Sequence, residues 1–184
     1  MSKRTVVGMC FALVATMLVA DASTAWGQRP RSAIERRLHP GRGFWANRRA
    51  YRNMRHARDY SQSIYNYSRD AATIEPQVAK AESERLGQDI AGAQKELAIA
   101  RKEAGKDKDT LAALDVVEKH LAKAAEMHKA LHEECCKDDV DGGICAKHCS
   151  EITKELEKAM TEHAALIRKH ELKEDASKDE GGKR

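Results

Sequence analysis

Apolar and small residues recur along this chain in alternating steps of three and four residues, in four stretches of similar length. Such spacing places side chains on one stripe of an α-helix, so each stretch predicts a helix with one buried face. The first stripe includes Ala50 and Met54, and the last begins with Cys145 and Cys149. The four predicted helices cover residues 45–74, 76–104, 108–136 and 144–172.

The residues between these stretches are of the kinds that end or begin helices. Pro76 suits the first turn of a helix, Gly105 suits a helix C-terminus, and Asp107 is an N-cap candidate. Gly142 and Gly143 permit a further turn. Helices of roughly 28–30 residues, each about 43 Å long, with short connections favour antiparallel neighbours. The pattern therefore predicts an all-α, up-down-up-down four-helix bundle over residues 45–172.

Two alternatives share this pattern. If Pro76 only kinks one very long helix, the chain forms an extended antiparallel helical hairpin or coiled coil. If two hairpins pair, the same seams serve a homodimer, so the sequence leaves the oligomeric state open. The seams are rich in alanine and serine, and aromatic residues make up only 4% of the chain. We therefore expect a core with few large side chains.

The N-terminal residues have the order of an export signal. Lys3 and Arg4 precede an apolar run over residues 5–20, and small residues follow it. This order predicts a cleaved signal peptide over residues 1–25, with cleavage after Ala22 or Ala25. The run is shorter than the roughly 20 residues that span a membrane. We expect a periplasmic or secreted protein with no transmembrane span after cleavage.

Charge divides the rest of the chain into a basic and an acidic part. Residues 26–60 contain ten arginines against Glu35 and Asp59, a net charge of +8. Residues 61–184 contain 21 Lys+Arg and 26 Asp+Glu, a net charge of −5. Residues 26–44 are a basic head that we expect to be partly disordered, and residues 173–184 are a charged tail that we expect to be disordered.

The basic part of the chain, residues 26–60, has the chemistry to bind anions. The planar guanidinium of arginine suits phosphate and carboxylate groups, and Phe44, Trp45 and Tyr51 are interleaved with the arginines, as in interfacial segments. We predict binding to an anionic envelope polymer or to lipid headgroups, and not to nucleic acid, which an exported protein rarely meets. The alternative is that the head packs against the acidic body of its own chain. The candidate binding residues are Arg36, Arg37, Arg42, Arg48, Arg49, Arg52 and Arg55.

Four cysteines remain once the signal peptide is removed, and they flank the last predicted turn. An even number of cysteines outside the cytoplasm indicates disulfides. In an antiparallel hairpin that turns near residues 139–141, Cys135 faces Cys149 and Cys136 faces Cys145. Each bridge would contribute about 3 kcal/mol by constraining the unfolded chain. The disulfide-bonded protein needs no cofactor.

A metal site is an alternative use of the same cysteines. Zn²⁺ takes four tetrahedral thiolate or imidazole ligands, and Cu(I) prefers soft thiolates. His128 and His163 are weaker candidates, and a His120–His163 pair would suit a shared ion or a pH-sensitive contact. The candidate ligands are Cys135, Cys136, Cys145, Cys149, His132 and His148.

The chain carries no motif of the common enzyme classes. It has no phosphate-binding glycine loop, no G-x-S-x-G sequence and no Glu-x-x-His pair of the kind that holds di-iron centres. We predict an exported, non-enzymatic bundle with a disulfide-bonded hairpin and a basic head that binds an anionic envelope partner. A Cu- or Zn-binding bundle is the first alternative, and a thiol-redox protein is the second.

Overall fold

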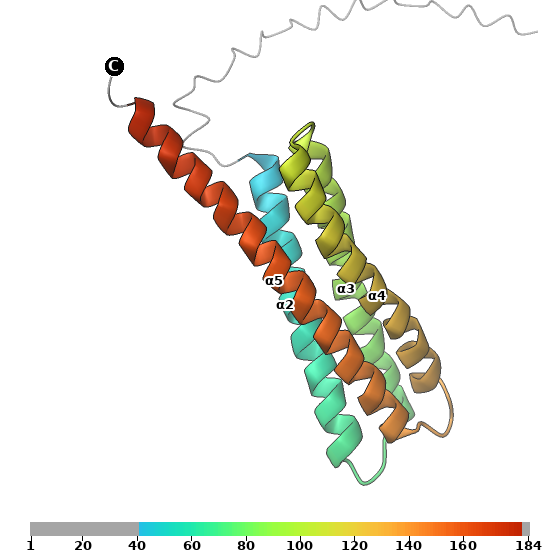
Figure 1. Cartoon of the computed structure of the whole chain (residues 1–184). Helices are drawn as coiled ribbons and strands as arrows, with labels where there is room; N and C mark the ends of the chain where they lie inside the picture. The colour runs from blue at the N-terminus through green and yellow to red at the C-terminus, as the bar shows by residue number, and fades with distance from the viewer. Residues whose placement is uncertain (1–40, 182–184) are drawn as a thin grey trace, which may run out of the picture.

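The computed structural model describes residues 41–181, with side chains described as far as residue 169. These residues form four α-helices and no strand: α2 (Arg42–Asp70), α3 (Pro76–Ala104), α4 (Lys108–Cys135) and α5 (Gly142–Gly181). The helices pack against one another (Figure 1), which confirms the prediction of an all-α bundle of four helices. The predicted signal peptide, residues 26–40 of the basic head and residues 182–184 lie outside the described residues.

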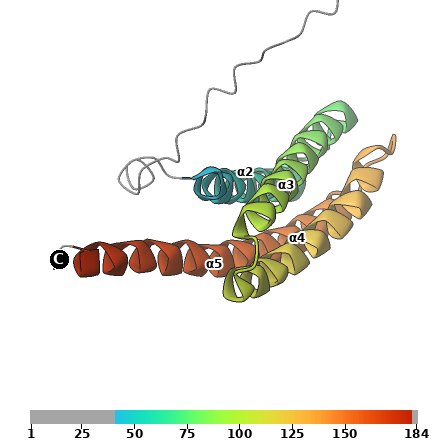
Figure 2. The ribbon, with the colours of Figure 1, turned by 90° about the horizontal axis from the view of Figure 1, so that it is seen from above.

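Each helix contacts two others, so the four helices form a ring. Both α2 and α4 pack against α3 and α5, and Figure 2 shows this arrangement from above. Residues near the start of one helix contact residues near the end of the next. Arg49 of α2, for example, binds Glu96 of α3. Pro76 therefore begins a separate helix that lies beside α2, and the extended-hairpin alternative does not hold.

The residues predicted to begin or end helices do so at α3 and α4. Pro76 occupies the first turn of α3. Gly105 follows α3 with a φ of 59°, a backbone conformation that favours glycine. Asp107 caps α4, since its carboxylate accepts a hydrogen bond from the Thr110 backbone N–H at 3.2 Å.

Two helices differ from their predicted ranges by more than one residue. α2 begins at Arg42, inside the basic head, and ends at Asp70, because the chain becomes extended before Pro76. α5 begins at Gly142 and continues to Gly181, through residues 173–181 that we expected to be disordered. These residues are rich in Glu, Lys and Ala and contain no proline, so they extend the helix until the glycine pair that begins at Gly181.

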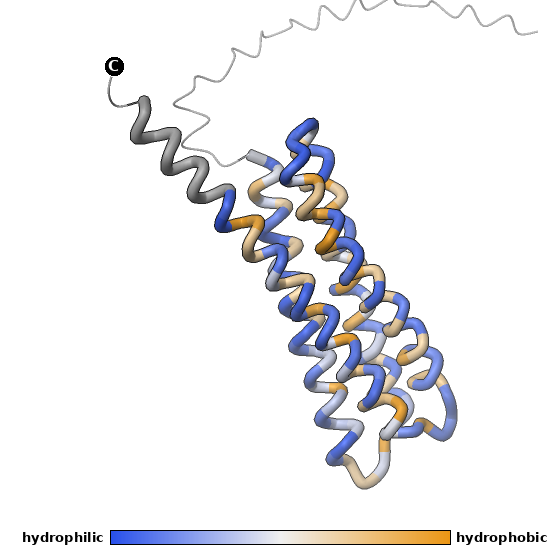
Figure 3. The backbone as a smooth tube through the Cα atoms, viewed as in Figure 1, coloured by the Kyte–Doolittle hydropathy of each residue, from blue (hydrophilic) through white to orange (hydrophobic). Residues whose placement is uncertain are grey.

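The buried residues follow the predicted seams. Polar and apolar positions alternate along each helix in Figure 3, and the apolar ones supply the core. The α2 seam consists largely of alanine and serine, so its neighbours approach its backbone closely. The fully buried large apolar side chains include Met54, Leu86, Leu97, Leu114, Leu121, Leu131, Ile152 and Leu156.

The start of α5 lies against the end of α2. A Cβ added to Gly142 would lie 2.5 Å from the Ser68 carbonyl oxygen and 2.8 Å from Ile74 Cδ1. The first of these atoms belongs to the backbone and cannot swing aside. Glycine at this position therefore sets how closely the α4–α5 connection approaches α2.

We expect Gly142→Ala to lower the free energy of unfolding by about 1–3 kcal/mol, because the added methyl group meets backbone. Urea unfolding followed by circular dichroism measures the change. Gly143→Ala is the matched control, since its Cβ would meet only the Asp141 carboxylate, at 3.2 Å, which a shift of a few tenths of an ångström relieves. Equal unfolding midpoints for the two variants would show that the close approach at residue 142 is not required.

Candidate functional site

The cysteines at residues 135–149 lie at one end of the bundle, where α4 connects to α5; we call this segment the cysteine turn. Cys135, Cys145 and Cys149 are buried, whereas Cys136 is exposed. Cys135 Sγ lies 3.8 Å from Cys145 Sγ, which is a thiol hydrogen bond and not a covalent bond. All four thiols are free in this structure. The pair that meets is neither Cys135–Cys149 nor Cys136–Cys145.

The observed pairing differs from the predicted one because α5 begins earlier than expected. α5 starts at Gly142, where the sequence pattern predicted residue 144. The turn is therefore centred closer to α4, and each α4 residue faces an earlier residue of α5. Cys135 then meets Cys145, one helical turn before Cys149.

The two thiols of the Cys135–Cys145 pair differ in acidity. The hydrogen bond between the two thiols lowers the pKa of Cys145 and raises the pKa of Cys135. Cys145 also lies in the first turn of α5, where the helix dipole favours negative charge. One thiol is thus prepared to lose its proton while the other retains it, which is the asymmetry that thiol–disulfide exchange uses.

Hydrogen bonds around Glu134 fix the shape of the cysteine turn. The buried Glu134 carboxylate accepts from the Lys137 ammonium at 2.5 Å and from the Asp141 backbone N–H at 3.1 Å. The bond from Lys137 lowers the pKa of Glu134. The Asp141 carboxylate in turn accepts from the Ile144 backbone N–H at 3.0 Å. These bonds hold the register of α4 against α5 without a covalent link.

The other two cysteines have separate surroundings. The Cys149 carbonyl accepts the Ser61 hydroxyl of α2 at 2.9 Å, and burial raises the pKa of the Cys149 thiol to about 12. Cys136 Sγ lies 3.6 Å from His132 Nε2, one turn earlier on α4. His148 lies instead near a carboxylate, with Nδ1 4.0 Å from Glu151 Oε2.

The ligands predicted for a closed metal site do not converge. Across the side chains of residues 41–169, no group of three or more His, Cys, Asp or Glu residues is placed to hold a metal ion. His128 donates its Nε2 hydrogen to the Ser83 carbonyl at 2.8 Å. His120 Nδ1 lies 2.7 Å from Glu155 Oε2, so His120 bonds to a neighbouring carboxylate, and the alternative of a His120–His163 pair does not form.

His163 is fully buried and joins α5 to α2. Its Nε2 lies 2.8 Å from Asn47 Oδ1. Because the Asn47 amide nitrogen donates to the Gly43 carbonyl at 3.0 Å, the amide oxygen faces His163 and accepts the imidazole hydrogen. Burial lowers the pKa of His163 to about 4, so the ring is neutral near pH 7. His163 Nδ1 has no hydrogen-bond partner in the described part of the chain.

The arginines of α2 serve two purposes. Arg49 binds the Glu96 carboxylate of α3 through two nitrogens, each at 2.9 Å. This is the kind of contact expected if the basic part of the chain packs against its own acidic body. Arg36 and Arg37 lie outside the described residues. Four exposed side chains on one side of α2, with Trp45 51% exposed, make up what we call the arginine face: Trp45, Arg48, Arg52 and Arg55. Arg42 is also exposed but points to another side of the helix.

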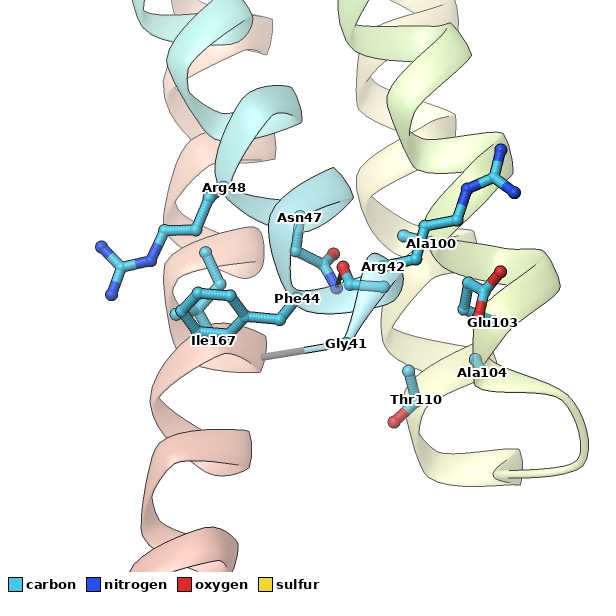
Figure 4. A pocket seen from close by; sticks show the side chains of 11 residues that line it. Gly41, Arg42, Phe44, Asn47, Arg48, Ala100, Glu103, Ala104, Thr110 and Ile167 are labelled. Carbon is cyan, nitrogen blue, oxygen red and sulfur yellow. Dashed lines mark hydrogen bonds between the residues drawn. The ribbon is translucent and has the colours of Figure 1, made fainter. Parts of the chain in front are cut away.

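A pocket of about 300 Å³ opens beside the first turn of α2. Phe44 and Ile167 line one side of it, and Ala100 lines the other (Figure 4). Arg42 and Arg48 extend away on opposite sides, and the Arg48 guanidinium lies over the Phe44 ring at 5.3 Å from its centroid. The pocket therefore combines apolar walls with two arginines and the Glu103 carboxylate at its margin.

No family model, curated protein or solved structure matches this chain. None of the described helices, α2 to α5, has a stretch long and apolar enough to cross a membrane. The functional proposals therefore rest on the geometry of the cysteine turn and of the arginine face.

Sequence reasoning missed three polar residues that shape these sites. Glu134 organises the cysteine turn, Asn47 holds His163, and Ser83 bonds to both His128 and His132. Their positions in the sequence could have indicated two of them. Glu134 directly precedes the seam residue Cys135, and Ser83 is itself a seam residue. Polar side chains at or beside an apolar stripe require hydrogen-bond partners.

Proposed function

We propose that this protein is an exported, non-enzymatic helical bundle that binds an anionic partner of the cell envelope through its arginine face. One observation carries the proposal. At 100° per residue, Trp45, Arg48, Arg52 and Arg55 fall within about 80° of the circumference of α2. Three cations and an aromatic ring thus point to the same side of one helix.

The chemistry of these side chains suits a phosphate-bearing surface. Arginine binds phosphate through two parallel N–H groups, and an exposed tryptophan is favoured at membrane–water interfaces. Within residues 41–169, neither Arg52 nor Arg55 takes part in an ion pair, so both are available to a partner. The apolar pocket beside Phe44 adds a place for part of an amphiphile. Lipid headgroups are therefore favoured over a soluble polymer.

The double variant Arg52→Gln/Arg55→Gln tests this proposal. Each basic residue near an anionic membrane contributes about 1 kcal/mol, so losing two should weaken binding to phosphatidylglycerol-containing vesicles by about thirtyfold. Vesicle sedimentation measures the partition. Lys119→Gln/Lys123→Gln is the matched control, because it removes the same charge from exposed positions on α4. Equal losses in both double variants would mean that only net charge matters, which contradicts a defined face.

Two further arms identify the source of the anion. Trp45 fluorescence in a Trp26→Phe background should shift to the blue on anionic vesicles but not on phosphatidylcholine alone, as the indole enters the interface. A soluble anionic polysaccharide should bind more weakly and cause no such shift. Stronger binding to the polysaccharide than to vesicles would move the proposal from lipid headgroups to an envelope polymer. Export itself predicts a mature N-terminus after Ala22 or Ala25.

A thiol-redox protein is a second candidate, favoured by the unequal acidity of the Cys135 and Cys145 thiols. A structural disulfide in an exported protein resists reduction, with a potential below about −300 mV, whereas redox-active bridges lie higher. Equilibration in dithiol buffers followed by thiol counting gives the potential. A value in the range of known oxidoreductases, about −270 to −120 mV, would favour the redox candidate.

A further inference from the structure

His132 and Cys136 form a pair at the end of α4 that the proposed function does not use. Cys136 is the C-cap residue of α4, and its backbone N–H bonds to the His132 carbonyl one turn earlier, so the two side chains lie on the same side. Cys136 is exposed and His132 is half-buried. The two polar atoms that face each other, His132 Nε2 and Cys136 Sγ, are 3.6 Å apart. Imidazole nitrogen and thiolate sulfur are the two ligands that Zn²⁺ most often takes in proteins.

The distance between these atoms is the one that a tetrahedral zinc ion imposes. Zn–N bonds are about 2.0–2.1 Å and Zn–S bonds about 2.3 Å, which at the tetrahedral angle places nitrogen and sulfur about 3.6 Å apart. A linear two-coordinate ion with the same bond lengths would need about 4.3 Å. The pair therefore has the spacing of two ligands of one tetrahedral ion without any movement of α4.

The His132 ring is held by its other nitrogen. His132 Nδ1 lies 3.3 Å from Ser83 Oγ, and Ser83 is fully buried on α3. When Nδ1 donates its hydrogen to this hydroxyl, Nε2 carries the lone pair that faces Cys136. Protein groups that bind the second nitrogen of a histidine in this way orient it for metal ligation.

His128 completes the support of the His132 ring. Its ring stacks on that of His132 with centroids 6.0 Å apart, and its Nε2 is fixed by the Ser83 carbonyl. Gly87 makes room for His128, since a Cβ there would lie 2.5 Å from His128 Cε1. The two histidine rings line an open hollow of about 470 Å³ between α3 and α4. Cys136 does not line this hollow but is itself exposed, so both ligands are accessible from solvent.

We propose that His132 and Cys136 bind one Zn²⁺ ion, with the other coordination positions open to water or a small ligand. Binding displaces the Cys136 thiol proton, which passes to solvent. Two ligands from this chain make an open site, unlike the closed site of four ligands predicted from the sequence. The inference does not depend on the arginine face, and the two can fail separately.

Titration of the fully reduced chain with Co²⁺, a spectroscopic substitute for Zn²⁺, tests the proposal. We expect one ion per chain, with a thiolate-to-cobalt charge-transfer band and the intense visible absorption of tetrahedral Co²⁺, both removed by added Zn²⁺. His132→Gln and Cys136→Ser should each abolish the charge-transfer band. Ser83→Ala should retain the band and lower the affinity by about tenfold, as expected for a group that only positions a ligand.

The Cys145→Ser variant separates this site from the buried thiols. In reduced protein, Cys135 and Cys145 also carry free thiols. If one of them supplied the sulfur ligand, Cys145→Ser would change the charge-transfer band. We expect this variant to bind Co²⁺ as the unmodified chain does. Circular dichroism melting verifies that each variant is folded. A band that survives Cys136→Ser, or that is lost in Cys145→Ser, would overturn the assignment to His132 and Cys136.

Discussion

Lowering the pH from 7 to 4 is expected to reduce the free energy of unfolding by about 3 kcal/mol through His163 alone. Burial lowers the pKa of His163 in the folded protein to about 4, whereas the unfolded chain has the ordinary value of 6.5. Between these values the unfolded chain takes up a proton that the folded protein does not. The stabilisation is therefore complete above pH 6.5 and is lost as the pH falls through 4.

Urea unfolding at closely spaced pH values measures this loss. His163→Gln retains a donor for Asn47 Oδ1 and cannot titrate, so its stability curve should be flatter by about 3 kcal/mol over this range. His56→Gln, at an exposed position, should retain the slope of the unmodified chain. Burial also lowers the pKa of His128, so the difference between the chain and the His163 variant is the informative quantity. Parallel curves for these two proteins would contradict the assignment.

Glu155 acts in a separate, more acidic range. Bonds from Lys158 and His120 lower its pKa to about 2 from the ordinary value of 4.5. Its stabilisation is present above pH 4.5 and is lost as the pH falls through 2. Measurements above pH 4.5 therefore report on histidines with little contribution from this carboxylate.

Oxidation of the cysteine turn should produce one disulfide, between Cys135 and Cys145, and raise the free energy of unfolding by about 3 kcal/mol. The thiols are 3.8 Å apart, so a small side-chain rotation brings the sulfurs to bonding distance. Closing this short loop removes conformations from the unfolded chain. For a bundle of this size, about 3 kcal/mol corresponds to an increase of about 10 °C in melting temperature on oxidation.

Variants that leave a single possible pair make this prediction specific. Cys136→Ser/Cys149→Ser should still lose two hydrogens on oxidation, by intact mass, and should show the full rise in melting temperature. Cys145→Ala should show neither. Proteolysis of the oxidised chain identifies the bridge that forms, since the Cys135–Cys149 and Cys136–Cys145 bridges predicted from the sequence give different linked peptides. Detection of either as the main product would contradict the observed register.

The periodicity of the sequence was sufficient to predict the helices and their buried faces. Alternating steps of three and four residues depend only on helix geometry, and the stripes through Met54, Leu86 and Leu121 are buried as that geometry requires. Pro76 and Gly105 act on their own backbone, so their effects can also be predicted locally.

The details of the sites depend on distances between helices, which periodicity does not specify. A change of two residues in where α5 begins was enough to alter the partner of Cys135. The start of α5 is fixed by hydrogen bonds to Glu134 and Asp141 and by the close contact of Gly142 with α2. The Asn47–His163 contact likewise depends on which helices become neighbours, and each residue alone resembles many surface positions.

The ring of helices closes between the first and the last of them. The bonds Ser61–Cys149 and Asn47–His163 span 88 and 116 residues of sequence. A chain that emerges from its N-terminus presents the α2–α3 pair first and must leave the groove for α5 open until the end of the chain arrives. Long separations of this kind slow folding, so the final docking of α5 is the step at which this small bundle is most exposed to wrong partners.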